Sequence, residues 1–268
     1  MDKKEFVLNR VREHYEFAES HGYEIVMLAL QGSQNYGLDV YTDEYKSDVD
    51  TKAIVLPRFE DFCKGKDPVS KTLVLPNDEH CDVKDVRVMF KTFEKQNINF
   101  VEILFSKYII INPKYEDIVK DLISLKEDVA SINKNQALRC MAGMSKEKLK
   151  AMEHRYPATA DKIDKYGYDP KQLHHILRMN DFIHRYVDDV PYEECLIPSN
   201  ADYLKEIKVT PMPLEEARKL AITTDKNTEA VKNVCSEIPE VVNYKTLEKL
   251  NEISYRLLKR YMKEQILD

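Results

Sequence analysis

The strand-like segments of this sequence lie in its first third, which limits any sheet to that part of the chain. Residues 23–30 (YEIVMLAL) form a short apolar run that leads into Gln31-Gly32-Ser33, and residues 48–56 (DVDTKAIVL) alternate before turning apolar. Runs of this length and β-branched content favour strands over helices. Two shorter candidates, 72–75 and 81–84, are separated by the turn-like Pro76-Asn77-Asp78. The pattern predicts a small sheet of three or four strands.

Helical spacing dominates the rest of the chain. Residues 5–20 place apolar side chains three and four positions apart. Residues 86–96 repeat that spacing behind Asp85, which is placed to cap the first turn. Beyond them, prolines punctuate a series of helical segments. The sequence therefore predicts an α+β fold, with a sheet-bearing domain over 1–125 and a helical domain over 126–268.

Composition excludes several classes of protein. The 268 residues are 43% hydrophobic and 33% charged, as in globular proteins that fold by themselves. No stretch reaches the ~18 apolar residues that cross a bilayer, and the N-terminus lacks a signal-peptide pattern, so we expect a cytoplasmic protein with no membrane partner. A net charge of −6 disfavours a basic surface that blankets nucleic acid. The five widely spaced cysteines are expected to be reduced thiols.

Gly32-Ser33 and the pair Asp48 and Asp50 form the pattern that points to chemistry. Residues two apart in a strand face the same way, so the two carboxylates project together while Val49 packs into the core. Adjacent carboxylates repel each other unless a divalent cation such as Mg²⁺ or Mn²⁺ neutralises them. The glycine lets backbone N–H groups approach a phosphate, and the serine hydroxyl adds a donor. Separately these features are most often ordinary turns and solvated pairs; together they describe a site for a metal-chelated triphosphate.

The order of these residues resembles a known signature. In the DNA polymerase β-like nucleotidyltransferase superfamily, one strand ends in Gly-Ser and the next carries Asp-x-Asp. Three motifs are similar, more narrowly, to a predicted nucleotidyltransferase family related to RNA-repair-associated polymerase β-like proteins; they are Gly32-Ser33, Tyr36-Gly37-Leu38 and Ser47-Asp48-x-Asp50. The spacing from Ser33 to Asp48 is longer than in that family, by an insertion around residues 41–46 that a surface turn can accept.

Three later segments extend the resemblance, which covers roughly residues 25–220. Residues 97–106 (NINFVEILFS) are similar to the family's Asn-Pro-x-x-x-Glu-x-Leu-x-Ser stretch, with Ile98 where proline is usual. Residues 168–178 (YDPKQLHHILR) resemble its Tyr-Asp-x-Lys-x-x-x-His-x-x-Arg helix. Residues 211–217 stand where the family has a short segment before its last helices.

The resemblance implies a small mixed β-sheet nucleotidyltransferase core with flanking helices, and a helical half that completes the cleft. It also implies a third carboxylate that joins Asp48 and Asp50 as a metal ligand and serves as the base. Asp82 is the preferred candidate, on a strand just before the helix that begins near Val86. Asp85 is the alternative, although a helix cap explains it better.

A cationic helix face is the second implied part of the site. Lys171, His175 and Arg178 fall at i, i+4 and i+7, so a helix presents them together, and the resemblance favours their binding the triphosphate or an acceptor phosphate. The same residue types are common on solvated surfaces. Tyr36 either packs the turn or stacks on a base. Glu102 is expected to be half-buried in a structural ion pair, and a catalytic role is the less favoured alternative.

These expectations together predict a metal-dependent nucleotidyltransferase. It would transfer a nucleoside monophosphate from an NTP to a hydroxyl or phosphate acceptor, release pyrophosphate and require Mg²⁺ or Mn²⁺. The acceptor could be an RNA end, a small molecule or a protein side chain. The main alternative is a non-catalytic nucleotide-binding or antitoxin-like regulatory protein with the same fold. An unrelated helical interaction protein is the third possibility.

Overall fold

The structure, a computed structural model, describes residues 2–43 and 45–267, and the chain divides into two units. The sheet unit comprises Met1–Asn35, Asp48–Ile132 and Asn243–Asp268; the helical unit comprises Tyr36–Ser47 and Asn133–Val242. The chain thus passes between the units four times, where the sequence suggested a single boundary near residue 125. The reason is that the C-terminal helix packs on helices of the sheet unit, while the segment after the first strand packs with the helical unit.

Five described strands form one mixed sheet in the order β3-β4-β2-β1-β5. The strand β2 runs antiparallel to β1 and parallel to β4, whereas the pairs β3–β4 and β1–β5 are antiparallel. The four strands expected from the sequence are confirmed, but β5 at the edge was not predicted because three residues are too few to show a periodicity. The strand bounds are β1 (Glu24–Gln31), β2 (Asp50–Leu56), β3 (Ser70–Val74), β4 (His80–Asp85) and β5 (Ile109–Ile111).

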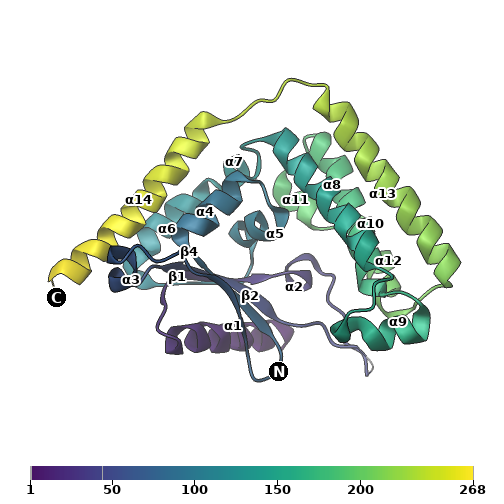
Figure 1. Ribbon diagram of the computed structural model, residues 1–268, viewed down its shortest axis with the longest axis horizontal. Coiled ribbons are helices and arrows are strands. Elements are labelled where there is room, and N and C mark those ends of the chain that lie inside the picture. Colours follow the sequence, from purple (N-terminus) through teal and green to yellow (C-terminus); the bar gives the residue numbers. More distant parts are fainter. Residues whose placement is uncertain (1, 44, 268) are drawn as a thin grey trace. The chain divides into compact units, whose positions relative to one another are not determined.

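Helices cover both faces of the sheet (Figure 1). The helix α1 (Lys3–Ser20) lies on one face, where Val7, Val11 and Ala18 are fully buried in a core shared with β1, β2 and β4. Burial of these apolar side chains holds α1 on the sheet. Short turns formed by α3 (Phe59–Cys63) and η2 (Pro113–Tyr115) join other elements. The opposite face carries α4 (Val86–Glu94), α5 (Ile98–Val101), η1 (Glu102–Phe105), α6 (Glu116–Ser124), α7 (Lys126–Ala130) and α14 (Tyr244–Leu267).

Asp85 marks the point where β4 ends and α4 begins. Its Oδ1 accepts the N–H of Arg87 at 2.9 Å, and its Oδ2 pairs with the Arg87 guanidinium at 2.7 Å. The carboxylate is fully buried, so the cap and the ion pair together satisfy it. The prediction that Asp85 caps this helix is confirmed.

The helical unit is arranged around α10 (Pro170–Val187). This helix contacts α8 (Lys134–Ala151), α11 (Tyr192–Leu196), α12 (Ala201–Val209) and α13 (Leu214–Ser236). It begins at Pro170 because Asp169 accepts the N–H of Lys171 at 3.1 Å as the N-cap and proline suits the first helical position. The short α9 (Ala160–Tyr166) and η3 (Pro157–Thr159) precede it.

The segment between α2 (Ser33–Tyr36) and β2 is a compact loop. The backbone of Ser47 donates to Val40 at 3.0 Å, and the N–H of Val40 donates to the Ser47 hydroxyl at 2.9 Å. These bonds close the loop at its base, as expected for an insertion in a turn. The insertion expected at 41–46 includes Glu44, which lies outside the described residues.

No helix within residues 2–43 and 45–267 is both long enough and apolar enough to cross a bilayer. All five cysteines lie in the described part of the chain, and none of them forms a disulfide.

Candidate functional site

The Gly32-Ser33 turn follows directly on β1. Gly32 has a φ of +80°, and a Cβ there would meet no atom within 4 Å, so the left-handed backbone rather than space calls for glycine. The N–H of Gly32 donates to Oε1 of Glu102 at 3.3 Å. This contact occupies the N–H that was expected to approach a phosphate. The Ser33 hydroxyl has no hydrogen-bond partner among the described residues.

Glu102 is more deeply buried than the sequence suggested. Its side chain was expected to be half-buried, yet it is 3% exposed at the start of η1 and accepts the Gly32 N–H. A buried carboxylate is costly unless it is paired or hydrogen-bonded, so this contact helps to explain why Glu102 is tolerated. It also fixes the geometry of the Gly32 turn.

Asp48 lies two residues before Asp50, the first residue of β2. Val49 between them is 1% exposed and belongs to the core beneath α1, whereas Asp48 is exposed and Asp50 is half-buried. The prediction that Val49 packs inward is confirmed. The register of the sheet pairs Gln31 with Asp50, so the Gly32-Ser33 turn begins beside the carboxylate pair.

One oxygen of Asp50 is held by the neighbouring strand. Its Oδ1 accepts the backbone N–H of His80 at 3.0 Å, and Nδ1 of the His80 ring lies 3.4 Å away. Oδ2 of Asp50 has no hydrogen bond or ion pair within the described part of the chain. A backbone N–H restrains the carboxylate without supplying the full charge of an ion pair. Asp50 is therefore oriented and still has an oxygen for a ligand.

The turn that delivers the His80 N–H is anchored by Glu79. Oε2 of Glu79 pairs with Nη2 of Arg10 at 2.7 Å and with Nε2 of His14 at 2.9 Å. The other nitrogen of this fully buried histidine lies 2.9 Å from the Thr51 hydroxyl. Burial alone would raise the pKa of Glu79, but hydrogen bonds, those from His14 first, lower it to about 2. The network therefore ties α1 to both strands that meet at Asp50.

Sequence reasoning missed this network. Glu79 lies 69 residues from Arg10, and no local spacing connects the two. The one available signal was His14, a polar residue placed on the apolar side of the first helix between Val11 and Ala18.

Asp82 lies on the same face as Asp50 but has different partners. The register pairs Asp82 with Lys52; the Lys52 ammonium donates to Oδ2 at 2.6 Å and the Thr72 hydroxyl donates to Oδ1 at 2.5 Å. Burial would raise the pKa of Asp82, but the positive charge of Lys52 and these hydrogen bonds outweigh burial and lower it. Lys52 itself is 4% exposed and lies 4.2 Å from the centre of the Phe100 ring.

The sheet unit offers carboxylate donors that suit a divalent cation. Mg²⁺ is commonly held by one or two carboxylates together with substrate phosphates, and Asp48 with Asp50 fits that donor set. A set of three does not form: no group of three or more His, Cys, Asp or Glu side chains among the described residues is arranged to hold a metal ion. The role of Asp82 as a third ligand stays a prediction, and it requires the contacts with Lys52 and Thr72 to open.

The remaining predicted residues lie in the helical unit. The guanidinium of Arg178 stacks on the ring of Tyr36, with its central carbon 4.2 Å from the ring centre, and both side chains are buried. This contact supports the reading in which Tyr36 packs the turn. Burial, followed by the charges of neighbouring basic groups, lowers the pKa of His175, so this side chain is neutral at pH 7. Lys171 lines a pocket of the same unit.

The predicted site residues therefore divide between the two units. Gly32, Ser33, Asp48, Asp50 and Asp82 belong to the sheet unit, and Tyr36, Lys171, His175 and Arg178 belong to the helical unit. The sheet register brings the Gly32 turn beside Asp50. The pairing of β2 with β4 places Asp82 beside Lys52 rather than beside Asp50.

Comparisons with known proteins give a likeness among solved structures. No protein-family model matches the chain, and no curated protein matches it. Among solved structures, the chain is similar to a nucleotidyltransferase-like protein from Exiguobacterium sibiricum 255-15, with 13% identity and a TM-score of 0.32. The match covers 85% of this chain and 75% of the other. We therefore base the function on the contacts of the site residues.

Proposed function

We propose that this protein is a nucleotidyltransferase that moves a nucleoside monophosphate from an NTP to a hydroxyl or phosphate acceptor and uses Mg²⁺ or Mn²⁺. The observation that carries the proposal is the strand register that pairs Gln31 with Asp50, since Gly32-Ser33 follows Gln31 and Asp48 lies two residues before Asp50. A small turn with a serine donor next to two carboxylates suits a triphosphate that brings its own cation.

In this proposal the residues have separate tasks. Asp48 and Asp50 would hold the cation, and the N–H of His80 restrains Asp50 through its Oδ1. The Ser33 hydroxyl donates to a phosphate oxygen, while Glu102 keeps the Gly32 backbone in the conformation that presents it. When bound, the cation would polarise the α-phosphate and stabilise the departing pyrophosphate.

The transfer exchanges one bond at the α-phosphorus for another. The acceptor oxygen forms a bond to the α-phosphorus, and the bond from that phosphorus to the bridging oxygen of pyrophosphate breaks. A hydroxyl acceptor loses its proton to a base. Asp82 is the candidate base, but it can accept a proton only after Lys52 releases it, because the ion pair lowers its pKa. Lys171, His175 and Arg178 stay candidates for binding phosphate, with the acceptor an RNA end, a small molecule or a protein side chain.

The Lys52–Asp82 pair also favours a second candidate function. A third acid held by a buried lysine suits a protein that binds a nucleotide without turning it over, such as an antitoxin-like regulator. The two functions differ in one observable. A nucleotide that binds without reaction raises the melting temperature by mass action and releases no pyrophosphate.

Pyrophosphate release tests the leading proposal. Purified full-length protein with Mg²⁺ or Mn²⁺ and an α-labelled NTP should release pyrophosphate or label an acceptor. Asp50→Asn should reduce the rate by at least about 100-fold, since the variant loses a charged metal ligand. Asp128→Asn changes an exposed aspartate of α7 and is the matched control, with an unchanged rate expected. Unchanged activity in Asp50→Asn would overturn the proposal.

A further inference from the structure

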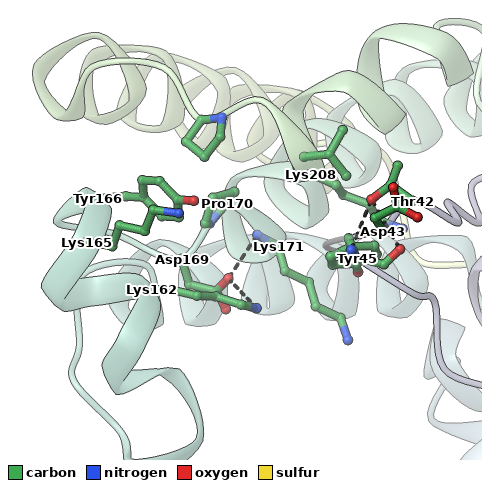
Figure 2. Close-up of a pocket in the computed structure, with 12 residues that line it drawn as sticks. Thr42, Asp43, Tyr45, Lys162, Lys165, Tyr166, Asp169, Pro170, Lys171 and Lys208 are labelled. Carbon is green, nitrogen blue, oxygen red and sulfur yellow. Dashed lines mark hydrogen bonds and ion pairs between the residues drawn. The ribbon is translucent and has the colours of Figure 1, made fainter.

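A pocket with a cationic lining lies wholly within the helical unit. Its volume is about 630 Å³, within the range of roughly 300–1,000 Å³ that small-molecule sites occupy. In Figure 2, Lys165 and Tyr166 lie at one end, Thr42, Asp43 and Tyr45 lie at the other, and Lys171 lies between them. The wall is completed by Lys162, Asp169, Pro170, Lys208, Val209 and Pro211.

Four lysines line this pocket against two aspartates. One of the aspartates is already committed, because Asp169 caps α10 at the N–H of Lys171 and pairs with Lys162 at 3.2 Å. Lys208 is 8% exposed, and its ammonium donates to the carbonyl oxygen of Leu38 at 2.8 Å. Its positive charge is thus held in a fixed place. The balance of charge in the pocket favours an anion.

Two adjacent histidines of α10, His174 and His175, lie in the same positive potential. Burial and, after it, the nearby charges of Lys208, Arg178 and Lys171 together lower the pKa of His174 to about 3, against the hydrogen bond to the Leu204 carbonyl, which raises it. Burial, followed by the neighbouring groups of His174, Lys171, Arg178 and Lys148, lowers the pKa of His175. Both side chains are neutral at pH 7, so the lysines supply the cationic character of this region.

The pocket also has aromatic and apolar walls. Tyr45 and Tyr166 contribute rings, and the Lys165 ammonium lies 4.9 Å from the centre of the Tyr166 ring. Pro170, Val209 and Pro211 add apolar surface. Lysine ammonium groups bind phosphate as point charges, and tyrosine rings can stack on a planar base. The combination suits a ligand that carries both.

We propose that this pocket binds a nucleotide-sized ligand that bears two or more phosphates. The binding needs no catalysis at Asp48 and Asp50, so it stands apart from the transferase proposal although Lys171 appears in both. Lys162, Lys165 and Lys171 contact the phosphates, and Tyr45 or Tyr166 contacts the base. Because the phosphate contacts are partly exposed, the affinity falls as salt is raised.

Calorimetric titration of the full-length protein in EDTA tests this site, because removal of divalent cations silences a metal-dependent one. ATP and inorganic triphosphate are the probes. We expect ATP to bind, and Lys165→Glu to weaken it by at least tenfold, about 1.4 kcal/mol. Lys165 is exposed on α9, so this variant should fold. Lys226→Glu makes the same charge change at an exposed position of α13 and should leave the affinity unchanged.

The outcomes separate this proposal from the transferase proposal. ATP binding in EDTA that survives in Asp50→Asn and fails in Lys165→Glu supports the pocket, whatever the activity assay shows. Triphosphate that binds as tightly as ATP shows that phosphate alone is recognised and overturns the part assigned to the tyrosines. Absence of binding by both probes, or equal weakening in Lys226→Glu, overturns the proposal as a whole.

Discussion

Asp50 and Asp82 lie on neighbouring parallel strands and face the same side of the sheet, yet their surroundings differ. Asp50 is held at one oxygen by a backbone N–H from His80. Asp82 is held at both oxygens, by the buried ammonium of Lys52 and by the Thr72 hydroxyl. The strand β2 accounts for the contrast, because residues 50 and 52 of one strand meet residues 80 and 82 of the next.

The difference shows how a sheet can hold like-charged groups in two roles. A carboxylate that is restrained by a neutral donor keeps its negative charge available for a cation. A carboxylate that is paired with a buried lysine has its charge neutralised within the fold. Asp50 therefore suits ligand binding and Asp82 suits stability. Substitutions at Asp82, Glu79 and Asp85 test this difference.

The largest expected effect on stability comes from Asp82. Asp82→Asn should lower the free energy of unfolding by about 3–5 kcal/mol, because it leaves the Lys52 ammonium buried without its charged partner. Asp50→Asn should change it by less than about 1 kcal/mol, since it removes no ion pair with a buried lysine. Urea unfolding at pH 7 measures both. Equal losses of unfolding free energy in the two variants would contradict the difference between Asp50 and Asp82.

The next effect comes from Glu79, which orients Asp50 indirectly. Its pKa falls from 4.5 to about 2 on folding, so Glu79→Gln should cost roughly 2–3 kcal/mol at pH 7. The folded pKa is depressed; this stability is therefore present above pH 4.5 and is lost as the pH falls towards 2. Unfolding of both proteins at pH 7 and pH 3 checks the sign. A gap between them that widens on acidification would contradict this account.

The smallest of the three effects on the free energy of unfolding is expected at Asp85. The same variant shows whether Asp85 has only a structural role. Asp85→Asn keeps a cap for α4 but loses the ion pair with Arg87, at a cost of about 1–2 kcal/mol, because the guanidinium that loses its partner is partly exposed to water. Pyrophosphate release should be unchanged. A large loss of activity in a variant that melts near the wild-type temperature would instead make Asp85 the third acid.

Much of the sheet could be predicted because local patterns encode it. The runs at 23–30 and 48–56 are strands, and Asp85 caps the helix after β4 as its position suggested. The partners of Asp82 could not be predicted in the same way. Lys52 and Thr72 reach it only through the strand register, and a shift of two residues would have set Asp82 beside Asp50 instead.

The helical unit shows the same limit. The spacing of Lys171, His175 and Arg178 correctly places all three on one helix. It could not show that Arg178 stacks on Tyr36, or that lysines 162, 165 and 208 line a pocket with Lys171, because these contacts join segments far apart in the sequence.

Binding of Mn²⁺ in the presence of a non-hydrolysable NTP analogue tests the claim that Asp48 and Asp50 form a metal–nucleotide site. Electron paramagnetic resonance of the full-length protein reports the bound ion without any need for turnover. We predict a bound Mn²⁺ signal in the wild type and in Asp128→Asn, and its loss in Asp50→Asn. A signal of undiminished strength in Asp50→Asn would contradict the claim.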